Sequence, residues 1–275
     1  MNKVATLGPT GTFTELAAKK YIQNVNMDAK IVFYPSITKV FNSIGRECEL
    51  GIIPIENLLD GYVQPTLDLL SHTDLHIIYE LVIPIQFAFV GNDLNMSDIK
   101  KIYAQFKTQG QCCRFLEQFT NAKIITTESN GESLEQVRKG TLGESAIIPR
   151  HMLDVGEKFT YNIENVTDSV DNETRFIILS KDAVSYDMNK DYKTSIVIVN
   201  TLNEPGVLSK ILNEFSKRDI NLTSIISRPT KSALGKYHFF IDIDGYYPEE
   251  TNIKQAIDEI SKRNVVKILG SYSLI

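Results

Sequence analysis

Asp171-Asn172-Glu173-Thr174-Arg175-Phe176-Ile177-Ile178-Leu179 is the stretch around which the rest of the chain is arranged. It places a polar segment and an arginine directly before an apolar run that is typical of a strand. A hydroxyl, a guanidinium and an aromatic ring at the mouth of a strand favour a site over a core. Taken alone, the stretch fits an ordinary capped strand start equally well, so its meaning depends on the other segments.

Length and composition indicate a water-soluble protein of two domains. The 275 residues exceed one compact core, and 43% apolar with 23% charged residues is ordinary for globular protein. A formal net charge of −5 argues against nucleic acid, because phosphate binding needs clustered Lys and Arg. No signal-peptide pattern and no apolar run of about 18 residues occurs, so we expect a cytoplasmic protein without membrane contact.

The sequence does not indicate a metal site. Cys48, Cys112 and Cys113 are odd in number and two are adjacent, which fits neither a disulfide framework nor a zinc spacing. His72 and His76 lie four apart, but the second belongs to a strand-like run and no further ligand is positioned to join them. We therefore expect no metal.

Strand-like and helix-like segments alternate along the first 180 residues, which predicts a mostly parallel sheet with helices on both faces. Thr12-Phe13-Thr14-Glu15 and Ser129-Asn130-Gly131-Glu132 have the spacing of capping boxes and predict helix starts. The apolar run 75–90 contains Pro84, so we divide it into two strands and place a crossing between two lobes there.

The predicted fold is α/β, with a two-lobed, periplasmic-binding-protein-like domain over residues 1–180. Lobe 1 takes about 1–82 and 159–180, and lobe 2 takes about 83–158. Ligands of such sheets lie outside the carboxyl ends of the strands, which favours a cleft between the lobes.

The last third of the chain predicts a separate small domain. Residues 181–192 are polar and aperiodic, as expected of a linker. Residues 193–275 then follow the order β-α-β-β-α-β, which is the ferredoxin-like arrangement.

Three segments resemble, in order, the motifs of prephenate dehydratases. Gly8-Pro9-Thr10-Gly11-Thr12-Phe13-Thr14 resembles GPxGTFS, and Pro54-Ile55-Glu56-Asn57 followed by Gly61 resembles PIENSxxG. Asn172 with Thr174-Arg175-Phe176 resembles NxTRF. The segments Pro205-Gly206-Val207-Leu208 and Ser227-Arg228-Pro229 look like the ACT regulatory domain of these enzymes.

The resemblance implies decarboxylative dehydration of prephenate to phenylpyruvate in phenylalanine biosynthesis, without a cofactor. It implies that Thr174 assists the leaving hydroxyl, as a preorganised donor can. Arg175 would place a substrate carboxylate or brace the cleft, and Phe176 would pack behind Thr174. The residues implied in substrate binding are Thr12, Phe13, Glu56, Asn57, Gly61, Asn172, Arg175 and Phe176.

The same resemblance implies phenylalanine as an allosteric effector and a homodimer or homotetramer, because ACT sites usually form between chains. Ile226 stands where the family has the glutamate of its ESRP motif, which removes a partner for the ligand ammonium or for Arg228. The residues implied in effector binding are Asn203, Gly206, Val207, Leu208, Ser227, Arg228 and Pro229.

Two departures from the family pattern leave alternatives open. Leu58 replaces the serine that follows PIEN, and residues 104–110 share little with the family's YSHPQALAQC segment. A related cyclohexadienyl enzyme, either an arogenate dehydratase or a prephenate decarboxylase, is one alternative. A non-catalytic amino-acid-binding regulator is another.

Overall fold

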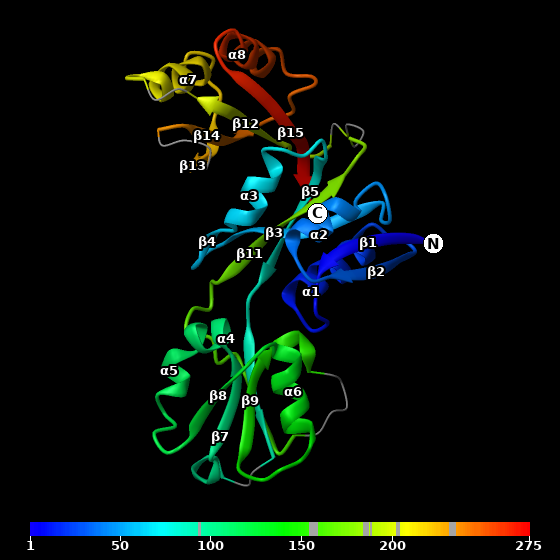
Figure 1. Cartoon of the computed structure of the whole chain (residues 1–275), viewed down its shortest axis with the longest axis vertical. Helices are drawn as coiled ribbons and strands as arrows, with labels where there is room; N and C mark the ends of the chain where they lie inside the picture. Colours follow the sequence, from blue (N-terminus) through cyan, green and yellow to red (C-terminus); the bar gives the residue numbers. More distant parts are fainter. Residues whose placement is uncertain (93–94, 154–158, 184–186, 188, 202–203, 231–234) are drawn as a thin grey trace.

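The computed structural model describes residues 1–92, 95–153, 159–183, 187, 189–201, 204–230 and 235–275. The chain forms three bodies in a row, with lobe 2 at one end, lobe 1 in the middle and the C-terminal domain at the other end (Figure 1). The predicted combination of two α/β lobes with a ferredoxin-like domain is confirmed.

Lobe 1 is a sheet of order β5-β11-β3-β1-β2 with helices packed on it, and β4 pairs with β3. Helix α1 begins where predicted, because Thr12 accepts a hydrogen bond from the backbone N–H of Glu15. Ser36 caps α2 in the same way and accepts from the backbone N–H of Lys39. Its elements are β1 (Asn2–Leu7), α1 (Phe13–Asn24), β2 (Ala29–Tyr34), α2 (Ile37–Ser43), β3 (Leu50–Asn57), β4 (Gly61–Tyr62), α3 (Gln64–Leu70), β5 (His76–Pro84) and β11 (Glu173–Ser180).

Lobe 2 is a five-stranded sheet of order β10-β6-β9-β7-β8. Helix α6 starts at the second predicted capping box, where Ser129 accepts from the backbone N–H of Glu132. Its elements are β6 (Phe87–Gly91), η1 (Met96–Asp98), β7 (Lys101–Gln105), α4 (Phe106–Gln111), α5 (Cys113–Leu116), β8 (Lys123–Thr127), α6 (Asn130–Arg138), β9 (Glu144–Pro149), η2 (Arg150–Met152) and β10 (Tyr161–Glu164).

The five strands of each lobe sheet are mostly parallel, as predicted, with one strand reversed. In lobe 1 β11 runs antiparallel to β3 and β5, and in lobe 2 β6 runs antiparallel to β9 and β10. One boundary needs correction: the chain returns to lobe 1 later than residue 159, since β10 still pairs with β6.

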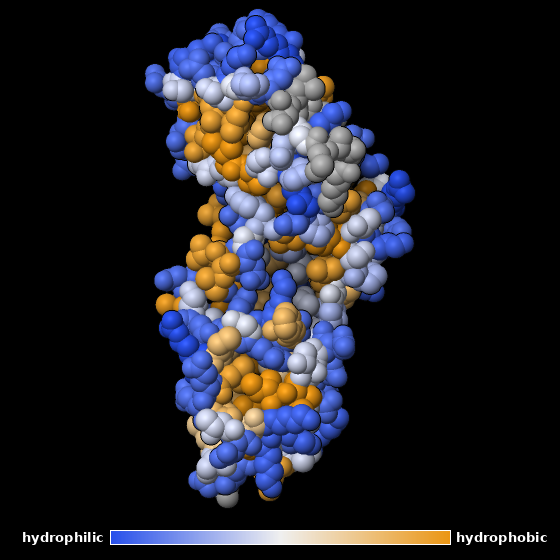
Figure 2. Space-filling view, turned by 60° about the vertical axis from the view of Figure 1, so that its left-hand side comes forward, coloured by the Kyte–Doolittle hydropathy of each residue, from blue (hydrophilic) through white to orange (hydrophobic). Residues whose placement is uncertain are grey.

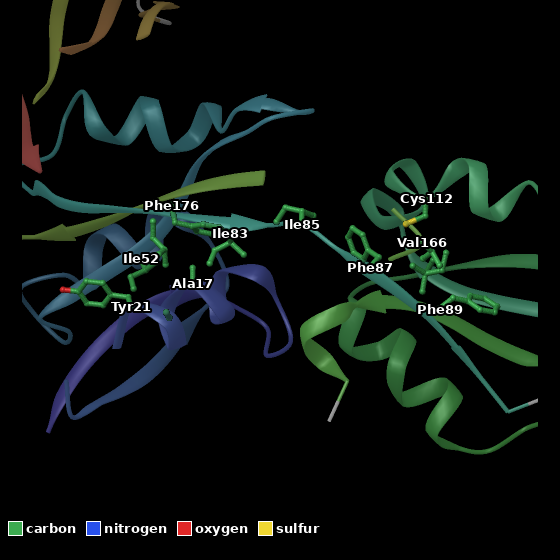
Figure 3. Close-up of a cluster of buried hydrophobic side chains, with 14 of the residues drawn as sticks. Ala17, Tyr21, Ile52, Ile83, Ile85, Phe87, Phe89, Cys112, Val166 and Phe176 are labelled. Carbon is green, nitrogen blue, oxygen red and sulfur yellow. The ribbon is translucent and has the colours of Figure 1, made fainter. Parts of the chain in front are cut away.

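The connections between the lobes are hydrogen-bonded to each other at two buried points. Ile85 N donates to the Asn172 carbonyl at 2.7 Å, and Val166 N donates to the Phe87 carbonyl at 2.9 Å. One core cluster continues along them from lobe 1 into lobe 2 (Figure 3). It includes Ala17, Tyr21, Ile52, Phe176, Ile83, Ile85, Phe87, Phe89, Cys112 and Val166. The predicted division of the run 75–90 is confirmed, because β5 ends at Pro84 and β6 begins at Phe87.

The C-terminal domain has a four-stranded antiparallel sheet of order β13-β14-β12-β15. Its two helices bury an apolar face against this sheet, with Ile211, Phe215, Ile253 and Ile257 in the core. The elements are β12 (Lys193–Thr201), α7 (Val207–Ser216), β13 (Leu222–Pro229), β14 (Tyr237–Asp244), α8 (Thr251–Ser261) and β15 (Val265–Leu274).

The sheet of this domain continues into lobe 1, which the sequence does not predict. The end of β15 pairs in parallel with β5, Ser273 opposite Tyr79 and Leu274 opposite Glu80. Gly270 makes this approach possible at φ +154°, because a Cβ there would collide with the carbonyl oxygen of Ile77. One sheet therefore runs from β13 to β2.

We expect Gly270→Ala to lower the free energy of unfolding by about 2 kcal/mol or more, since the new Cβ meets backbone in a conformation that L-residues avoid. Gly110→Ala is the control, because no atom lies within 4 Å of a Cβ built there. Chemical denaturation measures both variants, and equal stability of the two would contradict the structural role of Gly270.

Candidate active site

A cavity of about 730 Å³ lies between the two lobes, a volume suited to a small molecule. The molecular surface is hollowed at this level (Figure 2). Of the residues implied in catalysis and substrate binding, six line the cavity: Thr12, Phe13, Asn57, Gly61, Thr174 and Phe176. Glu56, Asn172 and Arg175 lie behind its wall instead.

Strand β11 places its side chains alternately on two faces, as any strand does. Thr174 and Phe176 face the cavity, and Phe176 is almost completely buried in the core of the two lobes. Arg175 points to the opposite face, toward the C-terminal domain. The segment Thr174-Arg175-Phe176 therefore contributes to the cavity on one face of β11 and to the contact with the C-terminal domain on the other.

Asn57 orients the hydroxyl of Thr174. Its amide Nδ2 donates to Thr174 Oγ1 at 2.9 Å and to Asn172 Oδ1 at 2.9 Å. The amide orientation is fixed because Asn57 Oδ1 accepts from the backbone N–H groups of Leu59 and Asp60, at 3.1 and 2.9 Å. Since Thr174 Oγ1 is already an acceptor, its own proton can be donated to a molecule in the cavity.

Asn172 supports this arrangement from behind. It is fully buried, accepts from Asn57, and donates through Nδ2 to Gln111 Oε1 at 3.3 Å. Gln111 belongs to lobe 2 and lines the cavity. Asn172 thus ties the wall of lobe 1 to that of lobe 2 at the point where the chain crosses between them.

Arg175 is held by three carboxylates. Its Nε lies 3.3 Å from Glu56, and its Nη1 lies 3.3 Å from Glu80 and 3.0 Å from Asp242 of the C-terminal domain. Burial by itself would lower the pKa of Arg175, but Asp242 and Glu80 raise it above its ordinary value. The guanidinium stays charged and braces β11 against the neighbouring domain.

The first turn of α1 forms another part of the wall. Thr12 is its N-cap, the alternative role that the sequence indicates for this side chain. Phe13 contacts lobe 2 edge-on, with ring centroids 5.5 Å from Phe87 and 5.1 Å from His151. Gly61 adopts φ +75°, a conformation that favours glycine, at the turn beside Asn57.

The family motifs in the sequence do not include the residues of lobe 2 that line the cavity. The segments that carry these residues directly follow β7 and β8, and the carboxyl ends of parallel strands are where such sites form. The order of the predicted strands was therefore a signal that could have located them. The lobe 2 wall comprises Gln105, Lys107, Thr108, Gln111, Glu128, Ser129 and Asn130.

The residues implied in effector binding occupy two places in the C-terminal domain. Gly206 is the N-cap of α7 with φ +80°, Val207 and Leu208 pack on the domain core, and Asn203 lies outside the described residues. Ser227 and Pro229 are exposed on the edge strand β13.

The side chain of Arg228 reaches lobe 1. Its Nε and Nη2 donate to the two carboxylate oxygens of Asp68 on α3, at 2.8 and 2.9 Å. Ile226, in the position of the ESRP glutamate, packs against the core cluster that lobe 1 shares with this domain.

An interlobe cavity with an oriented hydroxyl and an attached βαββαβ domain define a two-lobed α/β enzyme that acts on a small molecule. The model of the prephenate dehydratase family matches residues 4–184, and the model of the ACT domain matches residues 194–262. The chain belongs to the prephenate dehydratase family, whose members are lyases that remove water and carbon dioxide.

Known relatives match over nearly the whole chain. A prephenate dehydratase of Methanocaldococcus jannaschii is 34% identical over 99% of this chain and 98% of its own length. The prephenate dehydratase of Arthrobacter aurescens in complex with L-Phe is 29% identical, with a TM-score of 0.84 over 98% of this chain and 90% of that one. The Staphylococcus aureus enzyme is 29% identical, with a TM-score of 0.83 over 99% and 100%. No helix in the described part of the chain is long and apolar enough to span a membrane.

We expect His151 to make the lobe contact sensitive to acid. Both of its ring nitrogens are buried without a hydrogen-bond partner among the described residues. Burial lowers its pKa to about 4, although Glu15 opposes the shift. The unfolded chain takes up this proton near its ordinary pKa of about 6.5. Stability is therefore complete above that pH and falls as the pH drops toward 4.

The measurement is thermal unfolding of the wild type and His151→Phe between pH 7 and 5. The variant keeps a ring against Phe13 and loses the titrating group, so its melting temperature should fall less on acidification. His238, whose pKa is also lowered by burial, contributes equally to both proteins. Parallel curves for the two proteins would rule out His151 as the source.

Proposed function

We propose that this enzyme converts prephenate to phenylpyruvate in the cavity between the lobes, with Thr174 donating to the leaving hydroxyl. The observation that carries the assignment is the hydrogen bond from Asn57 to Thr174 Oγ1, which leaves the hydroxyl proton of Thr174 free for the substrate. Asn57, Gly61, Thr12, Phe13 and Phe176 form the surrounding wall on lobe 1.

The reaction needs placement more than chemical activation. As the C–C bond to the ring carboxylate breaks, its electron pair completes the aromatic ring and the C–O bond to the hydroxyl breaks. The leaving oxygen takes up one proton, so prephenate dianion and H⁺ give phenylpyruvate anion, CO₂ and water. A donor aimed at this oxygen stabilises the charge that develops on it. Glu56, Asn172 and Arg175 contribute by holding the donor and its strand in position.

We expect Thr174→Val, which keeps the shape but loses the hydroxyl, to lower kcat by roughly 10²- to 10³-fold, as loss of one preorganised donor does. Thr174→Ser keeps the donor and should retain much of the activity. Phenylpyruvate formation from prephenate is the assay, with thermal unfolding to verify the fold of both variants. Turnover by Thr174→Val near that of the wild type would remove Thr174 from the mechanism.

Product analysis also separates the alternatives. An arogenate dehydratase would favour arogenate over prephenate, and a decarboxylase would release CO₂ but keep the hydroxyl. A non-catalytic regulator would bind phenylalanine without forming phenylpyruvate. The oriented Thr174 hydroxyl favours the enzyme, because a sensor has no need of a leaving-group donor. A cytoplasmic location stays a prediction.

Phenylalanine is the proposed effector, bound between the C-terminal domains of a homodimer or homotetramer. The support is β13, the outermost of the described strands in this sheet, which exposes Ser227 and Pro229 and offers an edge with which a second chain can pair. Gly206, Val207, Leu208 and Arg228 complete the proposed effector region, and Asn203 is retained from the motif alone.

The contacts of this domain suggest how its state reaches the cavity. Tyr62 and Ser224 share a hydrogen bond of 2.8 Å, and Arg228 holds Asp68 on α3. Tyr62 lines the cavity, and so do Gln64 and Pro65 of the first turn of α3. A shift of β13 on effector binding would therefore act on segment 62–68, one wall of the cavity.

We expect Asp68→Asn to weaken feedback inhibition and leave basal turnover within about twofold. Loss of the two-pronged ion pair should raise the half-inhibitory phenylalanine concentration about tenfold, which lies within the usual range of coupling free energies. Asp28→Asn, an exposed change elsewhere in lobe 1, is the control. Calorimetry shows whether phenylalanine still binds, and unchanged inhibition of Asp68→Asn would exclude this route.

A further inference from the structure

The charges around the cavity do not suit a dianionic substrate. Among the described residues that line it, Lys107 is the single Lys or Arg, whereas Asp60 and Glu128 are acidic. Without Lys107, two substrate carboxylates would enter a wall that carries two further negative charges. Like charges this close destabilise binding, so a cation on this wall changes substrate affinity directly.

The backbone of Lys107 is held in place, whereas its side chain is largely exposed and can move. It lies in the first turn of α4, where its backbone N–H donates to the Gln105 side chain at 2.7 Å. Its side chain is 73% exposed, and its Nζ lies 3.5 Å from Oδ2 of Asp60. The ammonium group can therefore move within the cavity while its Cα stays in place.

The ion pair with Asp60 crosses the cleft, because Asp60 belongs to lobe 1 and Lys107 to lobe 2. Asp60 follows Asn57 in the turn that orients Thr174, and its backbone N–H donates to Asn57 Oδ1. The side chain of Asp60 is 49% exposed, and exposed ion pairs of this kind contribute little stability because solvent screens them. A substrate carboxylate can displace Asp60 from Lys107 at little cost.

We propose that Lys107 binds one carboxylate of the dianionic substrate, and that Asp60 holds the ammonium group while the cavity is empty. The inference rests on the proposed function and specifies how that substrate is held. Thr174 acts from lobe 1 and Lys107 from lobe 2, so the substrate itself joins the two walls. Lys107 lies in segment 104–110, where the sequence departs from the family pattern. The altered wall is thus the source of the positive charge.

Steady-state kinetics with prephenate on the full chain test this role. Lys107→Gln should raise KM about tenfold or more and leave kcat within about twofold, since a contact made equally in ground and transition states affects KM alone. Lys107→Arg keeps the charge and should keep most of the affinity. Asp60→Asn frees Lys107 and should lower KM.

The matched control is Lys123→Gln, which removes the same charge from an exposed position at the start of β8 in the same lobe. The rise of KM with ionic strength should be weaker for Lys107→Gln than for the wild type and for Lys123→Gln. Equal KM values for Lys107→Gln and Lys123→Gln would overturn the proposal.

Failure of the proposed function gives a different result. It would appear as absent phenylpyruvate formation by the wild type itself. In that case, equilibrium binding of prephenate to the wild type and to Lys107→Gln still tests Lys107. Weaker binding by the variant supports its role in carboxylate recognition, and equal binding excludes it.

Discussion

The burial of β11 between β3 and β5 is the constraint on which the rest of the structure depends. Both neighbours run antiparallel to it, so its hydrogen bonds are made on both edges and its register is fixed. Period-two alternation then sends Thr174 toward the cavity and Arg175 toward the C-terminal domain. A slip of one residue would exchange the two faces, placing a guanidinium in the cavity and a hydroxyl among carboxylates.

Because β11 has side chains on both faces, residues of lobe 1 and of the C-terminal domain together hold the site in place. Glu56 and Asn57 are adjacent on β3, one contacting Arg175 and the other Thr174. In the C-terminal domain, Asp242 is one of the three carboxylates that surround Arg175. Asp242 is itself held by Ser195, whose hydroxyl donates to it at 2.5 Å. Arg175 therefore contacts a residue of the C-terminal domain, while Thr174, one position earlier in the chain, faces the cavity.

The sequence predicted well whatever depends on local spacing. Helix starts at Thr12 and Ser129, the division of the run 75–90 and the βαββαβ order all follow from patterns within about ten residues. Long-range features escaped it. Asp242, which Arg175 contacts in the C-terminal domain, is 67 positions away, and the partner of Arg228 is 160 positions away. Lys107 belongs to no family motif, so the sequence alone did not indicate a role for it. Its position in the cavity beside Asp60 does.

The junction between β15 and β5 has a consequence for any attempt to isolate the catalytic part. Without β15, the backbone donors and acceptors of β5 at Tyr79 and Glu80 would face solvent along an open sheet edge. The apolar side chains that Phe240, Leu269 and Tyr272 now cover would be uncovered beside that edge. A shortened chain would thus expose an unpaired sheet edge beside an apolar surface. We expect it to self-associate even if its active site stays intact.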